Sequence, residues 1–80
     1  MATKQDLVIW VKEAIKAQQR SALIIEVAQY IWRHHESELF SSGKLFYTWQ
    51  YDMRWAANSL RRSGILKPVE KSPRGRWELL

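Results

Sequence analysis

Residues 54–80 read RWAANSLRRSGILKPVEKSPRGRWELL, and this stretch decides the fold class that the sequence predicts. Small and basic residues come first at helical spacing, and Gly64 then stands where a helix end favours a left-handed backbone. Two short apolar runs follow, at 65–69 and 76–80, separated by EKSPRG with its turn-forming Pro and Gly. The pattern predicts a helix and then a β-hairpin with a basic tip.

The helix before Gly64 is expected to span residues 49–63, with Thr48 as its cap. At 100° per residue, one face is predicted to be buried and carries Trp49, Met53, Ala56, Ala57 and Leu60. The opposite face carries aromatic, amide and guanidinium groups, with Arg61 at its edge: Tyr51, Arg54, Trp55, Asn58 and Arg62.

Two helices are predicted upstream. The first starts at a Thr3 cap, ends near Gln18 and buries Leu7, Trp10, Val11, Ala14 and Ile15, leaving Ile9 exposed. The second ends near His35 and carries an apolar stripe of Ile24, Val27, Ala28, Ile31 and Trp32. Ser21 either caps this second helix or belongs to an extended segment at 21–23. A loop is expected at 36–48, held to the core by Leu39, Phe40, Leu45 and Phe46.

Length and composition predict one small domain over residues 1–80 that folds without cross-links. The sequence has five Trp and no Cys, so aromatic burial must replace disulfides, and a thiolate metal site is excluded. No apolar run approaches the length of a membrane span, and the start does not resemble a signal peptide. We expect a soluble cytoplasmic protein without membrane contact.

Charge is distributed unevenly along the chain, whose net charge is +5. Residues 1–40 contain five basic and five acidic side chains, whereas residues 41–80 contain eight basic and three acidic ones. The excess in the second half indicates an anionic partner that touches one part of the molecule.

The predicted fold class is α+β and mainly helical: a winged helix-turn-helix of three helices followed by a C-terminal β-hairpin wing. In such a domain the third helix enters the major groove of double-stranded DNA and the wing meets the backbone. The expected DNA-binding residues are Lys44, Tyr51, Arg54, Asn58, Arg61, Arg62, Lys71, Arg74 and Arg76. Alternatively, the basic side chains of this set only form a solvated face. Trp55 and Trp77 are expected to pack within the structure.

Catalytic and metal sites find little support. The sequence shows no nucleophile beside a base, no glycine-rich phosphate loop and no recognisable carboxylate pair, so we expect a non-enzymatic protein without a cofactor. His34 and His35 are adjacent and therefore point about 100° apart on a helix, which is unsuited to one metal ion. They are expected to mark a helix end, where His favours the local dipole.

The segment from Ser42 to Leu79 resembles the amino-terminal winged-helix domain of Mrr-type restriction endonucleases. The matching residues are Ser42 and Gly43, Trp55 and Ala56, Leu60, Gly64 to Leu66, and Gly75 with Trp77. The resemblance implies a three-helix winged domain that holds DNA, here as a free-standing copy without the nuclease. It also implies a structural role for Trp55.

Two other functions remain open from the sequence. The domain could be an adaptor that binds itself or a protein partner through Tyr51, Trp55 and Ile9. It could also bind RNA or single strands by stacking bases on Tyr47, Tyr51 and Trp55, if those rings are exposed.

Overall fold

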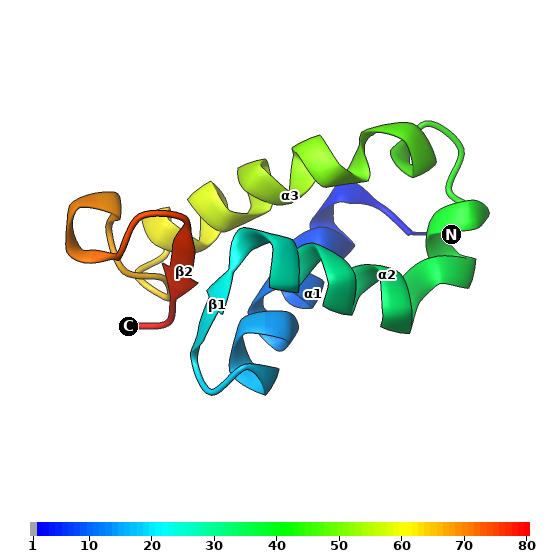
Figure 1. The fold of residues 1–80 in the computed structure, drawn as a ribbon. Coiled ribbons are helices and arrows are strands. Elements are labelled where there is room, and N and C mark those ends of the chain that lie inside the picture. The colour runs from blue at the N-terminus through cyan, green and yellow to red at the C-terminus, as the bar shows by residue number, and fades with distance from the viewer. Residues whose placement is uncertain (1) are drawn as a thin grey trace.

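Three helices and a short antiparallel sheet make up the fold in the computed structural model, which describes residues 2–80 (Figure 1). The architecture is mainly helical α+β, as predicted. The elements in chain order are α1 (Lys4–Ala17), β1 (Ser21–Leu23), α2 (Ile24–Phe40), α3 (Leu45–Arg62), the 3₁₀ turn η1 (Val69–Lys71) and β2 (Arg76–Glu78).

The predicted start and end of helix α1 are both confirmed. The Asp6 carboxylate accepts a hydrogen bond from the backbone N–H of Thr3 at 2.9 Å, which satisfies a donor at the start of the helix. The helix ends at Ala17, and the predicted apolar face is buried: Leu7, Trp10, Val11, Ala14 and Ile15. Ile9 is exposed, as expected.

Helix α2 follows strand β1, so the extended alternative for residues 21–23 is the correct one. Glu26 stabilises the start of the helix, because its carboxylate accepts a hydrogen bond from the Leu23 N–H at 2.7 Å. The predicted end near His35 is right only for the first segment of α2: His35 leaves helical geometry, with φ −131° and ψ 20°, but the chain resumes the helix directly and continues to Phe40. Burial of Leu39 on the core explains why this kink does not end the helix.

The connection between α2 and α3 is much shorter than the predicted loop over 36–48, and this prediction is also wrong. Only residues 41–44 separate the helices, and the buried Ser42 hydroxyl donates to the Glu38 carbonyl and accepts from the Ala2 N–H. Thr48 lies inside α3 and donates to Asp52 at 2.7 Å rather than capping the helix. Leu39 and Leu45 are buried as expected, but Phe40 is exposed.

The sheet differs from the predicted hairpin. Strand β2 pairs antiparallel with β1, with Ala22 opposite Trp77, and only Leu66 of the run at 65–69 bridges back, to Leu79. Pro68 has no N–H for a ladder, and the chain turns into η1 directly after it. The final strand is therefore flanked by 21–23 on one side and 65–67 on the other.

The core lies between the three helices and the sheet. The predicted inner face of α3 is buried, and α3 packs mainly along α1. Gly64 has a φ of 77°, and the N–H groups of Ile65 and Leu66 both donate to the Leu60 carbonyl, which ends the helix as predicted. Trp77 is buried in the core, as expected. Within residues 2–80, none of the helices has the length and apolar character needed to cross a membrane.

Candidate nucleic-acid interface

A straight stripe of exposed side chains runs along the outer side of α3. Successive spacings of four, three, four and four residues keep its members on one face: Tyr47, Tyr51, Arg54, Asn58 and Arg62. Gln50 is also exposed and lies one turn before Arg54, but it was not among the residues predicted to bind DNA. The stripe presents hydroxyl, amide and guanidinium groups to the outside.

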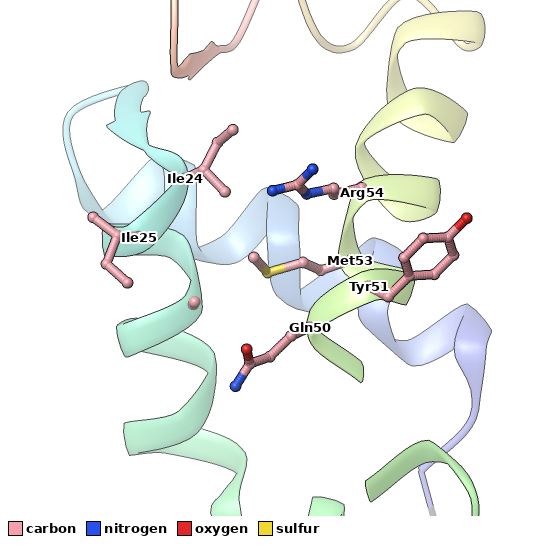
Figure 2. Close-up of a pocket in the computed structure, with 7 residues that line it drawn as sticks. Ile24, Ile25, Gln50, Tyr51, Met53 and Arg54 are labelled. Atoms are coloured by element: carbon pink, nitrogen blue, oxygen red, sulfur yellow. The ribbon is translucent and has the colours of Figure 1, made fainter. Parts of the chain in front are cut away.

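Arg54 lies at the edge of a groove between α2 and α3. Figure 2 shows its guanidinium reaching across towards Ile24, while the ring of Tyr51 points outward. The groove has a volume of about 520 Å³ and is lined by Ile24, Ile25, Ala28, Gln50, Tyr51, Met53 and Arg54. Within residues 2–80 no carboxylate forms an ion pair with Arg54, so its charge is available to an anion.

Arg61 supports the structure instead of pointing freely outward. Its Nε donates to the Lys67 carbonyl at 3.2 Å, and its terminal nitrogen donates to Asn58 Oδ1 at 3.2 Å. This contact orients the Asn58 amide, because only the oxygen can accept. The Asn58 amide nitrogen is then the group presented outward. A bidentate contact with adenine uses both the amide nitrogen and Oδ1, so Asn58 could make it only if Oδ1 also kept its hydrogen bond from Arg61.

Trp55 is half-buried and packs against the core, which supports the structural interpretation of this residue. Lys4 lies over its ring, with Nζ 4.7 Å from the centroid, and is 3.9 Å from Asp52 Oδ1. One ring face is therefore occupied by a cation. Of the three aromatic residues considered for base stacking, Tyr47 and Tyr51 are largely exposed and Trp55 is not.

Two cations of the C-terminal segment are held by Glu78. Lys67 Nζ lies 3.2 Å from Glu78 Oε1, and Arg76 donates to the Ser21 hydroxyl, which in turn donates to Glu78 Oε2 at 2.9 Å. Hydrogen bonds from Ser21 and Lys67, aided by the charges of Lys67 and Arg76, lower the pKa of the Glu78 carboxyl. Arg76 was expected near the basic tip of the hairpin. The structure places it in strand β2 instead, where it is half-buried.

The remaining predicted cations fall into two places. Lys71 and Arg74 are exposed on the loop before β2, which lies beside the C-terminal end of α3 that carries Arg62 (Figure 1). Lys44 precedes the opposite end of α3, about 27 Å from Arg62 along the helix axis. The structure thus brings Arg62 to the same end as Lys71 and Arg74 and leaves Lys44 apart from them.

The two histidines lie at the kink within α2, where the sequence predicted the end of a helix. The ring of His34 packs against that of Tyr30 in a tilted arrangement, with ring centroids 4.2 Å apart. His35, at the kink in α2, contacts Glu13 Oε1 through Nε2 at 3.0 Å and Glu38 Oε1 through Nδ1 at 2.9 Å. Over residues 2–80, no three His, Asp or Glu side chains are grouped so that they could hold a metal ion.

No protein-family model, curated protein or solved structure matches this chain.

Proposed function

We propose that the chain is a non-enzymatic winged-helix domain that binds double-stranded DNA, with α3 in the major groove. The observation that carries the proposal is the outer stripe of α3, which leads towards a loop with further free cations. Arg54, Asn58 and Arg62 face outward on the helix, while Lys71 and Arg74 lie on the loop beside its end. The major groove of B-form DNA is about 12 Å wide and admits one helix together with such side chains.

The order of the elements supports this fold assignment. A helix, a short strand, two helices and a strand that pairs back to the first strand form the winged-helix order. The residues between Leu66 and Arg76 then take the place of the wing. The resemblance to the amino-terminal domain of Mrr-type endonucleases agrees with this proposal and suggests a DNA-holding role.

Each proposed contact has a distinct part in binding. Lys71 and Arg74 meet backbone phosphates, which fixes the position of the domain without reading sequence. Arg54 and the amide nitrogen of Asn58 offer donors to base edges, where guanine and thymine present acceptors. Arg61 acts indirectly by holding Asn58.

Fluorescence anisotropy of a labelled random duplex of about 20 base pairs, between about 50 and 200 mM salt, tests the proposal. Phosphate contacts from Arg62, Lys71 and Arg74 give a slope of about −2.7 in log affinity against log salt, so affinity should fall about 40-fold over this range. A flat response, or no binding at the lowest salt, would refute DNA binding. Comparison of duplex with single-stranded DNA and RNA tests the stacking alternative on Tyr47 and Tyr51.

A further inference from the structure

We propose that this protein self-associates through an aromatic patch at the end of the molecule opposite to the proposed wing. The aromatic patch consists of Trp32, Phe40, Phe46 and Tyr47, where α2 ends and α3 begins. Its rings form a chain with centroids 5.9 Å apart for Trp32 and Phe40, 4.9 Å for Phe40 and Phe46, and 5.0 Å for Phe46 and Tyr47. Tyr47 is also the first residue of the outer stripe of α3, but the DNA contacts proposed above lie further along the helix and on the loop, from Arg54 to Arg74.

The exposure of the patch exceeds what isolated apolar surface residues would explain. Trp32 is 36% exposed, Phe40 61% and Tyr47 84%, and the adjacent Ile25 is 61% exposed. Scattered apolar residues are normal on a protein surface, whereas a contiguous patch marks an interaction site. The sequence assigned Trp32 and Phe40 to the core, and the structure places both at the surface instead.

A groove beside the patch supplies a complementary shape. It has a volume of about 420 Å³ and no charged lining residue: Ile25, Ala28, Gln29, Trp32, Phe46, Trp49 and Gln50. A two-fold contact requires one surface to carry both a projection and a hollow, because the same surface serves both copies. Phe40 and Tyr47 supply the projections, and this groove supplies the hollow.

The distribution of charge favours a second copy as the occupant. Around the patch, Arg33 and Lys44 are offset by Glu36 and Glu38, so that end carries no formal net charge. The excess lies in residues 61–78, which contain six basic and two acidic side chains. Two copies that meet at the patch keep their basic ends apart and so avoid repulsion. A nucleic acid would find no cluster of cations at this end.

The available area suits a weak dimer. The exposed parts of Ile25, Trp32, Phe40 and Tyr47 amount to roughly 500 Å² in one copy, taking about 200 Å² for a whole side chain. Two copies would bury roughly 1,000 Å² before any polar rim is counted, which is at the lower limit for a specific interface. We therefore expect a dissociation constant on the order of 10 µM.

Sedimentation equilibrium of the purified chain, from about 1 to 500 µM at 150 mM salt and without DNA, tests this proposal. The wild-type chain should pass from monomer to dimer over this range, and Phe40→Asp should weaken the dimer at least tenfold. Ile9→Asp is the matched control, because Ile9 is 62% exposed but lies on α1. This control should dimerise like the wild type.

A chain that remains monomeric at 500 µM would overturn the proposal, as would equal effects of Phe40→Asp and Ile9→Asp. Circular dichroism of both variants checks the fold, and Tyr47→Asp gives a second test at a side chain with few internal contacts. The result is separable from DNA binding. A monomeric Phe40→Asp variant should keep the salt dependence of the wild type on a duplex too short for two copies.

Discussion

The imidazole of His35 stacks on the indole of Trp10, with ring centroids 4.0 Å apart and planes inclined by 10°. Both ring nitrogens of His35 also face carboxylate oxygens, from Glu13 on α1 and Glu38 on α2. Because one nitrogen contacts a carboxylate on each helix, His35 ties α2 to α1 at the kink.

Replacing His35 should destabilise the fold. We expect His35→Ala to lower the free energy of unfolding by about 1–2 kcal/mol, because the stacked pair with Trp10 and the contacts with Glu13 and Glu38 are lost. Urea unfolding at pH 6 measures this loss. The neighbouring His34→Ala is the control and should change stability by less than about 0.5 kcal/mol, since His34 is exposed. Equal losses in the two variants would contradict the role assigned to His35.

Arg61 and Arg62 are neighbours with different expected roles. Arg61→Ala removes the hydrogen bonds to the Lys67 carbonyl and Asn58, and should lower the free energy of unfolding by about 1 kcal/mol. Arg62→Ala should leave stability unchanged and reduce DNA affinity, because this exposed side chain makes no hydrogen bond within residues 2–80. Thermal unfolding and anisotropy on the same samples separate the two effects. Stability losses of the same size would argue against the structural role of Arg61.

The loop cations should control the salt dependence of DNA binding. The double variant Lys71→Ala/Arg74→Ala should make the slope of log affinity against log salt shallower by about 1.8, because two phosphate contacts are lost. Anisotropy over the salt range above measures the slope. Lys12→Ala/Lys16→Ala on α1 removes the same charge from exposed positions elsewhere and should alter the slope much less. Equal changes would show that binding follows net charge alone.

Acid should weaken the contact between Glu78 and its partners. The pKa of Glu78 is lower in the folded chain than its ordinary value of 4.5, chiefly because Ser21 and Lys67 donate to the carboxylate. A lowered folded-state pKa adds stability above the unfolded-state pKa, and this stability is lost as pH falls through the folded-state value. The stability difference between wild type and Glu78→Gln should therefore be greatest near pH 7 and shrink below about pH 4.5.

Urea unfolding of both proteins between about pH 3 and 7 measures that difference. Glu70→Gln is a suitable control, since Glu70 is exposed and makes no hydrogen bond or ion pair within residues 2–80. The difference in free energy of unfolding between Glu70→Gln and the wild type should stay small at every pH. A Glu78→Gln curve parallel to the wild type would contradict the assigned contact.

Local patterns were sufficient for α1 and for the inner face of α3. Apolar residues at helical spacing identify both helices, and Gly64 identifies the end of α3 because its left-handed backbone suits Gly. Local patterns did not predict the structure between residues 35 and 48 correctly. Ser41, Ser42 and Gly43 indicate a break, but nothing local shows that α2 continues past His35 or that α3 starts at Leu45.

Among the candidate DNA contacts, the sequence alone indicated the outer face of α3 and the basic character of the second half of the chain. Which cations are free was decided by tertiary contacts. Glu78 forms an ion pair with Lys67 and is linked to Arg76 through the Ser21 hydroxyl. Ser21 is 57 residues away from Glu78 along the chain. Pairing over such a separation depends on the packed sheet and leaves no periodic pattern in the sequence.

The sequence by itself determined three helices, a buried aromatic and aliphatic core and a basic second half, because helix periodicity and charge are local properties. The tertiary structure decided that β2 pairs with β1, that His35 joins Glu13, and that Trp32 and Phe40 reach the surface. These outcomes depend on how α2 lies against α1 and α3. They arise from contacts between residues far apart in the chain, which only packing brings together.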